Sequence, residues 1–217
     1  MTDGKRLFFG VRVSLATANA LAQCAEQLAR RANDAKLDIR WAVPTSYHVT
    51  LKFLGWTRGD AIAAVRDTAE QALAGTQSFR FRTARLGAFP SLEKASVVWA
   101  GIEPSPLGEL ADKLDRAMAG IGFAPEKRPF AAHVTLGRLR ESRPVRDVVL
   151  PMSEQMFSDT RIEGVTLFES ETKSSGSVYS EISRIGFKTP DLSEKRQTGA
   201  LELGDETDDG WPRDKAR

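Results

Sequence analysis

One tetrapeptide occurs twice in this chain, and it constrains the fold more than any other feature. The ranges 48–51 and 133–136 both read HVTL, and their histidines, His48 and His133, are the only two in the sequence. By chance, a given histidine is followed by Val-Thr-Leu about once in a few thousand cases. The repeat therefore favours an internal duplication over two unrelated core histidines.

The predicted elements before the two copies follow the same order. A strand at Arg6–Val13 and an amphipathic helix precede the first copy, and a strand at Ser96–Ile102 and a second helix precede the other. The apolar faces of these helices are Leu21, Cys24, Ala25 and Leu28, with Thr17 as a cap, and Leu107, Leu110, Ala111, Leu114 and Met118. Two similar lobes are the expected result.

Further segments complete the predicted fold. They are an extended stretch at Leu37–Trp41, a helix from Asp60 with Ile62, Val65, Ala69 and Ala72 on one face, a strand at Ser78–Leu86, a helix within Ser142–Leu150, and a closing hairpin of Thr160–Glu169 with Ser177–Ile185. Helices thus alternate with strands along the chain, and only some of the strands show a regular polar–apolar alternation. We expect an α+β fold with two duplicated lobes, antiparallel-rich sheets around a central cleft and helices on the outside.

Composition indicates the domain boundary and the cellular setting. The 217 residues can bury a core without disulfides or metals, and the single cysteine, Cys24, excludes an internal disulfide and every multi-cysteine metal motif. From residue 189 onward, eight acidic residues stand against five basic ones and apolar residues are few. We expect a two-lobed domain over 1–188 and an acidic, disordered tail over 189–217.

The remaining charge balance bears on the ligand. The chain carries +2 and the tail −3, which leaves +5 on residues 1–188, a modest basic excess that suits a polyanion. No apolar run approaches about 18 residues, and the N-terminus lacks a signal-peptide core. A cytoplasmic enzyme or binding protein without a membrane span follows as the expectation.

Strand geometry predicts where the repeated side chains point. Because successive residues of a strand face opposite sides, His48 and Thr50 share one face while Val49 and Leu51 anchor the other. The second copy repeats this arrangement with His133 and Thr135. If the lobes face each other, two imidazoles and two hydroxyls meet in one cleft.

Two imidazoles and two hydroxyls suit displacement at phosphorus without a metal. One neutral imidazole accepts a proton from water and one charged imidazole protonates the leaving oxygen, while the hydroxyls donate to non-bridging phosphate oxygens. A zinc site is the rival use of histidine, but the sequence has no third histidine and no second cysteine to complete it. A different alternative is a non-catalytic RNA-binding module that uses the basic cleft.

At this point the residues resemble the two-histidine (2H) phosphoesterase superfamily, which is defined by a duplicated H-x-[ST]-x motif. The similarity is greatest to its RNA 2′,3′-cyclic phosphodiesterase branch, also labelled 2′-5′ RNA ligase. It runs in one register from about residue 6 to 186, through RWAVPTSYHVTLKFLG (40–55), LGAFPS (86–91), VVWAGI (97–102), RPFAAHVTLGRLR (128–140) and LFESETKSSGSVYSEI (167–182).

The resemblance implies a bilobal fold and hydrolysis of RNA 2′,3′-cyclic phosphate ends to 2′-phosphomonoesters, with a 2′-5′ ligase or phosphodiesterase side activity in some members. It implies His48 as proton donor to the departing 3′ oxygen, His133 as the base that activates water, and Thr50 and Thr135 as phosphate ligands. The implied partner is an RNA or oligonucleotide with a cyclic phosphate end. No cofactor, metal, membrane or obligate protein partner is implied.

Other residues are weaker candidates. Many members carry proline just before the second histidine, where this chain has Ala131-Ala132 and so lacks one backbone restraint. Phe130 could stack on a base or pack in the core, and Lys52 could contact phosphate but is more typical of a solvated lysine. Alternation points Arg138 away from His133 and gives it a structural role. Packing or lid roles are expected for Trp41, Trp56, Trp99 and Cys24.

Overall fold

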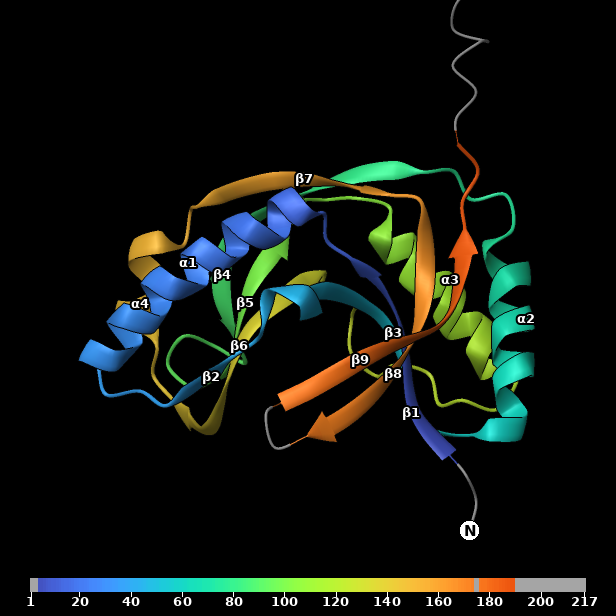
Figure 1. Ribbon diagram of the computed structural model, residues 1–217, viewed down its shortest axis with the longest axis horizontal. Helices are drawn as coiled ribbons and strands as arrows, with labels where there is room; N and C mark the ends of the chain where they lie inside the picture. The colour runs from blue at the N-terminus through green and yellow to red at the C-terminus, as the bar shows by residue number, and fades with distance from the viewer. Residues whose placement is uncertain (1–3, 174–175, 190–217) are drawn as a thin grey trace, which may run out of the picture.

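A computed structural model describes residues 4–173 and 176–189 (Figure 1). The strands are β1 Gly4–Arg12, β2 Ile39–Trp41, β3 His48–Arg58, β4 Phe79–Phe89, β5 Ala95–Ile102, β6 His133–Arg143, β7 Met156–Ile162, β8 Gly164–Lys173 and β9 Gly176–Gly186. The helices are α1 Leu15–Asp34, α2 Ile62–Leu73, α3 Leu107–Ala119 and α4 Arg146–Val149, with 3₁₀ turns at Pro44–Ser46, Gly59–Ala61 and Leu150–Met152. The predicted acidic tail lies outside the described residues, apart from Thr189.

Within the described residues, nine strands form one curled sheet in the order β7-β4-β5-β6-β3-β1-β8-β9, and β2 pairs with β6. All the strand-to-strand pairings are antiparallel. The α+β, antiparallel-rich prediction is therefore correct. The two lobes are the two ends of this continuous sheet, and they join where Val49 of β3 pairs with Val134 of β6.

The sheet order relates the two halves of the chain by a pseudo-twofold exchange. β4, which belongs to the first half, pairs with β5 of the second, and β8, from the second half, pairs with β1 of the first. The helices are exchanged as well, because α1 packs on β7, β2 and α4 while α3 packs on β3 and α2. In Figure 1, α1 and α4 accordingly lie over one end of the sheet and α2 and α3 over the other. Neither half of the sequence forms a lobe by itself.

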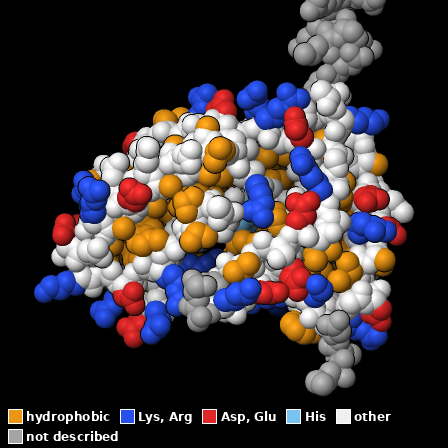
Figure 2. Space-filling model, viewed as in Figure 1, with side chains coloured by type: hydrophobic (Ala, Val, Ile, Leu, Met, Phe, Trp, Pro, Cys, Tyr) orange, Lys and Arg blue, Asp and Glu red, His pale blue; other side chains and the backbone are white. Residues whose placement is uncertain are grey.

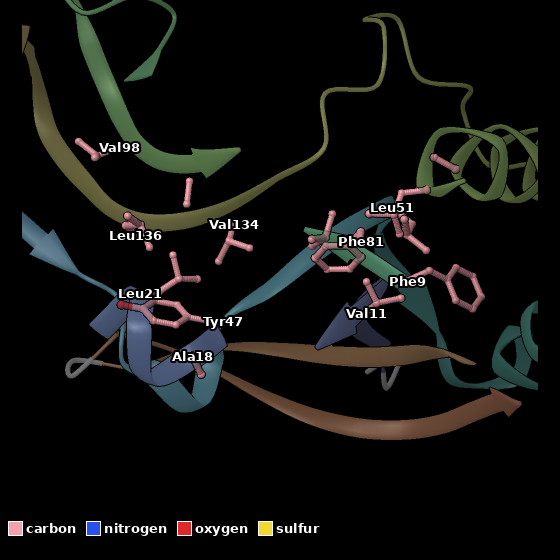
Figure 3. Close-up of a cluster of buried hydrophobic side chains, with 14 of the residues drawn as sticks. Phe9, Val11, Ala18, Leu21, Tyr47, Leu51, Phe81, Val98, Val134 and Leu136 are labelled. Atoms are coloured by element: carbon pink, nitrogen blue, oxygen red, sulfur yellow. The ribbon is translucent and has the colours of Figure 1, made fainter. Parts of the chain in front are cut away.

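Buried side chains from both halves form the core (Figure 3). Val134 and Leu136 of β6 point toward Leu21 of α1, whereas Leu51 of β3 lies with Phe9 of β1. The apolar residues of the HVTL repeats, Val49, Leu51, Val134 and Leu136, are all 3% exposed or less, as their alternation predicts. At roughly 1.5–3 kcal/mol for each large apolar side chain, this burial fixes both motifs on rigid strands.

Two sequence predictions about elements were wrong. Ser14, not Thr17, caps α1, and its side chain accepts a hydrogen bond from the Thr17 N–H. The segment Thr160–Glu169 is not one strand, because the chain breaks at Glu163 and β7 then pairs with β4 while β8 pairs with β1 and β9. Among the described helices none is long and apolar enough to cross a membrane.

Candidate active site

The pairing of β3 with β6 brings the two motifs together. Because Val49 lies opposite Val134 on antiparallel strands, one step to either side brings His48 toward Thr135 and Thr50 toward His133 on the other face of the sheet. These four polar side chains line one pocket. The predicted convergence of two imidazoles and two hydroxyls is therefore what the structure contains.

Each imidazole is held by a carbonyl two residues before it. His48 Nδ1 donates to the Ser46 carbonyl at 2.7 Å, and His133 Nδ1 donates to the Ala131 carbonyl at 2.7 Å. With Nδ1 as the donor, Nε2 is the proton-accepting nitrogen of each neutral ring. His48 Nε2 lies 3.1 Å from Thr50 Oγ1. The Ala131 carbonyl orients His133 without the proline that many family members carry.

Aromatic rings surround the two histidines unequally. His48 lies 4.9 Å from the ring of Phe8 and 4.8 Å from Tyr179, centre to centre, and His133 lies 5.0 Å from Phe89. Glycine is needed beneath His48, since a Cβ at Gly10 would approach the Val49 carbonyl to 2.8 Å. His48 is thus the more enclosed of the two imidazoles.

This enclosure affects the protonation of both rings. Burial lowers the pKa of His48 to about 4; the hydrogen bond to the Ser46 carbonyl raises it, and the nearby charges of Arg12, His133 and Arg138 lower it. Burial also lowers the pKa of His133 below its ordinary value, the bond to Ala131 opposes this, and Arg138 adds to it. Near neutral pH and without ligand, both imidazoles are therefore uncharged.

Two pockets meet at His48 and His133. We call the first, of about 890 Å³, the aromatic pocket because Phe53, Phe89 and Phe130 line it. The second, of about 490 Å³, contains all four motif side chains and is called the arginine pocket after Arg6, Arg40 and Arg138. Thr50, Phe53 and His133 line both pockets. In Figure 2 the face is hollowed near its middle, with Lys and Arg side chains at the edge of the hollow.

A β-bulge at the last residue of each motif overturned the predictions made for Lys52 and Arg138. Phe9 pairs with Lys52 and Gly10 with Thr50, so Leu51 is an extra residue, and Leu136 is extra in the same way on β6. Lys52 is consequently 1% exposed, bound to Asp115, and not a solvated lysine. Arg138, which alternation pointed away from His133, lies on the face of the histidines and lines the arginine pocket.

The remaining candidates have mixed outcomes. Cys24 is buried as predicted, and burial raises the pKa of its thiol to about 11. Trp56 is 71% exposed and so is not a core residue, whereas Trp41 and Trp99 are partly buried. Phe130 is partly buried and also lines the aromatic pocket, so its position is compatible with core packing and with stacking on a base.

Sequence reasoning missed several residues that line the pockets. They are Arg6, Phe8, Arg40, Phe53, Phe89 and Tyr179. Alternation along β1 could have found Arg6 and Phe8, because Leu7, Phe9 and Val11 of the same strand face the core. Nothing local in the sequence marks Tyr179, whose strand reaches His48 only through the pairing of β8 with β1.

The described residues contain no group of three or more His, Cys, Asp or Glu side chains placed to hold a metal ion. His48 and His133 therefore have no carboxylate or thiolate partner with which to form such a centre in that part of the chain. That the reaction needs no metal stays a prediction.

One antiparallel sheet that carries two HxT histidines into a shared cleft is the arrangement of the two-histidine phosphoesterases. The chain belongs to the 2′-5′ RNA ligase superfamily, whose family model matches residues 17–174.

Individual relatives agree with this assignment. An RNA 2′,3′-cyclic phosphodiesterase from Archaeoglobus fulgidus is 29% identical over 141 residues, which cover 64% of this chain and 78% of that protein. One from Aquifex aeolicus is 26% identical over 176 residues, which cover 78% of this chain and 93% of that protein.

Solved structures share the fold. TT0787 of Thermus thermophilus superimposes with a TM-score of 0.73 at 22% identity, over 86% of this chain and 100% of that one. Escherichia coli LigT complexed with 3′-AMP gives a TM-score of 0.64 at 22% identity, over 86% of this chain and 99% of that one.

Proposed function

We propose that this protein hydrolyses RNA 2′,3′-cyclic phosphate ends to 2′-phosphomonoesters by histidine acid–base catalysis, without a metal or cofactor. The observation that carries the proposal is the single pocket lined by His48, Thr50, His133 and Thr135. The names of the relatives, RNA 2′,3′-cyclic phosphodiesterases that span most of this chain, support the choice of substrate.

The reaction consists of one displacement at phosphorus. His133 takes a proton from water through Nε2 as the water oxygen forms a bond to phosphorus. The bond from phosphorus to the 3′ oxygen breaks, and His48 gives its Nε2 proton to that oxygen. The phosphate then remains on the 2′ oxygen. Exchange of protons with solvent restores the neutral His133 and the charged His48 for the next turnover.

The hydroxyls of Thr50 and Thr135 donate hydrogen bonds to the non-bridging phosphate oxygens. Negative charge accumulates on these oxygens in the transition state, so donors already in place there stabilise it more than the ground state. Both hydroxyls sit on strands anchored by buried valine and leucine neighbours. Little reorganisation is therefore needed when the substrate arrives.

The bound substrate favours the protonated form of His48, which is the form that the acid role needs. Without ligand the pKa of His48 is about 4, because burial lowers it and the positive charges of Arg12, His133 and Arg138 lower it further. A bound phosphate anion opposes these charges and raises the pKa of His48, so that the ring is protonated in the complex. Binding of the cyclic phosphate thus brings His48 into the protonated state from which it can donate a proton.

Product analysis tests the proposal. The protein is incubated with adenosine 2′,3′-cyclic phosphate and with a short RNA ending in a cyclic phosphate, and the products are separated from 2′- and 3′-monophosphate standards. We expect the 2′-monophosphate alone. A 3′-monophosphate product would assign the opposite leaving group. RNA binding without any turnover would favour the non-catalytic binding module, and joined RNA products would add the ligase activity of the superfamily name.

A further inference from the structure

The two pockets that meet at the catalytic pair differ in charge. Besides His133, which lines both pockets, five ionisable residues line the aromatic pocket, and three of them are acidic: Asp112, Asp115, Glu126, Lys52 and Arg128. Lys52 is neutralised there by its 2.6 Å contact with Asp115. The charged residues that line the arginine pocket are Arg6, Arg40 and Arg138, all cationic. An anion that reaches the histidines therefore meets an attractive field on one side and a repulsive one on the other.

The three arginines are available to a ligand. All are exposed, and none forms an ion pair with another residue in the part of the chain that the structure describes. Arg40 even lies directly opposite Arg138 across the β2–β6 pair, which is an unfavourable arrangement of like charges. By contrast, Arg58, Arg66 and Arg146 on the outer surface each contact a carboxylate. Phosphate groups of a ligand would therefore provide the anionic partners that these three arginines lack within the described residues.

The aromatic pocket has the opposite character. Phe53 is 51% exposed at the boundary of both pockets, Phe89 contacts the ring of His133, and Phe130 is partly buried nearby. Exposed aromatic faces stack on nucleobases at about 1–3 kcal/mol per base. The carboxylates beside them disfavour phosphate but can accept hydrogen bonds from the amino groups of a base. This pocket therefore suits a base better than a phosphodiester.

A terminal nucleotide has the same division of chemistry. Its base and its 5′ phosphodiester leave the ribose in different directions, and its cyclic phosphate lies on the 2′ and 3′ oxygens. We propose that the terminal base occupies the aromatic pocket, while the upstream phosphodiesters run through the arginine pocket. The substrate is then the end of an RNA chain rather than a free cyclic mononucleotide. This inference rests on the proposed function and adds the direction in which the RNA lies.

Substrate length tests the inference. kcat/KM is measured for adenosine 2′,3′-cyclic phosphate and for an oligoadenylate tetramer with the same cyclic end, between 50 and 200 mM salt. We expect the tetramer to have a kcat/KM at least about tenfold higher, with a fall in salt that the mononucleotide shows much less. Each phosphate contact on a single strand contributes a slope of about −0.7 in a plot of log affinity against log salt concentration.

Variants locate the effect. Arg6→Gln and Arg40→Gln should each lower the ratio of tetramer to mononucleotide kcat/KM and reduce the salt slope by about 0.7. Arg66→Gln is the matched control, because Arg66 lies on α2 and contacts Asp67 outside both pockets; it should keep the wild-type ratio. Phe53→Ala should instead lower kcat/KM for both substrates. Melting temperatures verify that each variant is folded.

The outcomes separate this inference from the function on which it rests. If the wild-type protein opens neither substrate, the proposed function fails and this inference fails with it. If it opens both with equal kcat/KM, or if Arg6→Gln and Arg40→Gln keep the wild-type ratio, the function stands and the proposed direction of the RNA is wrong.

Discussion

The ammonium Nζ of Lys52 lies 2.6 Å from Oδ1 of Asp115 and donates a second hydrogen bond to the Ala124 carbonyl at 2.7 Å. Asp115 Oδ1 also accepts from the Glu126 N–H at 3.0 Å. Burial raises the pKa of the Asp115 carboxyl, but the bonds from Lys52 and Glu126 outweigh it, so that the pKa is lowered overall. These contacts tie β3, one residue beyond Leu51, to α3 and to the connection that leads to His133.

We predict that the two partners of this pair differ in their effect on stability. Asp115→Ala leaves the 1% exposed ammonium without its carboxylate and should lower the free energy of unfolding by about 3 kcal/mol. Lys52→Met should cost less, because the Asp115 side chain is 24% exposed and water can solvate it. Urea unfolding measures both. A larger loss for Lys52→Met than for Asp115→Ala would contradict this account.

The HVTL repeats show how much of the site could be predicted from the sequence. Alternation correctly placed His48, Thr50, His133 and Thr135 on one face. Side chains of a regular strand point to opposite faces in turn, and both strands are regular over these residues. The α+β class and the convergence of the two motifs followed from that. The same rule failed beyond the bulges at Leu51 and Leu136, for Lys52 and Arg138. A bulge is set by the partner strand and carries no local signature here.

Long-range pairing explains the other misses. The strand expected at Thr160–Glu169 divides at Glu163 because β7 and β8 have different partners at opposite ends of the sheet. In the same way, Tyr179 comes near His48 only after β9 has joined β8. Neither fact is encoded in a short window of sequence. Propensities describe the segment, whereas the exchange of strands between the halves is a property of the whole fold.

The pH dependence should reflect the lowered pKa values of both histidines. kcat/KM follows the unliganded enzyme, so its bell-shaped profile should have both limbs at or below about 6.5. In kcat the alkaline limb should move to higher pH, because bound phosphate favours the charged His48. Since the rings influence each other, the limbs belong to the pair. A flat kcat/KM from pH 4 to 9, with chemistry rate-limiting, would exclude paired acid–base catalysis.

Removal of either motif hydroxyl should slow the reaction without unfolding the protein. Thr50→Val and Thr135→Val each delete one donor to the developing charge, which costs on the order of 2–4 kcal/mol in the transition state, or about 30- to 10³-fold in kcat. Thr83→Val is the matched control. Its hydroxyl is buried without a hydrogen-bond partner among the described residues, so this change should keep kcat and stabilise the protein slightly.

Equal turnover in the three threonine variants would move phosphate binding away from Thr50 and Thr135. The backbone amides of the cleft and Arg138 would then be the remaining donors to examine. Kinetics and thermal unfolding on the same preparations distinguish a lost hydrogen bond from a lost fold.

Chelation tests the expectation that no metal takes part. After dialysis against EDTA the protein should retain its kcat, because two imidazoles supply both proton transfers. Addition of Zn²⁺ or Mn²⁺ to the dialysed protein should then give no increase. Loss of activity in EDTA that a divalent ion restores would overturn the proposed mechanism, although it would leave the substrate unchanged.

The two histidines should behave as one catalytic unit. His48→Ala and His133→Ala are each expected to lower kcat by about 10²- to 10⁴-fold, the usual contribution of a general acid or base. Since both act in the same step, the double variant should be little slower than either single one. Binding of the RNA should weaken much less, because Thr50, Thr135 and the arginine pocket remain.

Turnover and binding are therefore measured separately on the three variants and the wild type, with circular dichroism and melting temperatures as folding controls. A binding module without catalysis would show the reverse pattern: no cyclic phosphate opening in the wild type, and both substitutions felt only in affinity. Acid–base catalysis needs both rings at once, and the β3–β6 junction brings their two motifs together on one sheet. Folded single variants that keep wild-type turnover would therefore remove the basis for acid–base catalysis at this junction.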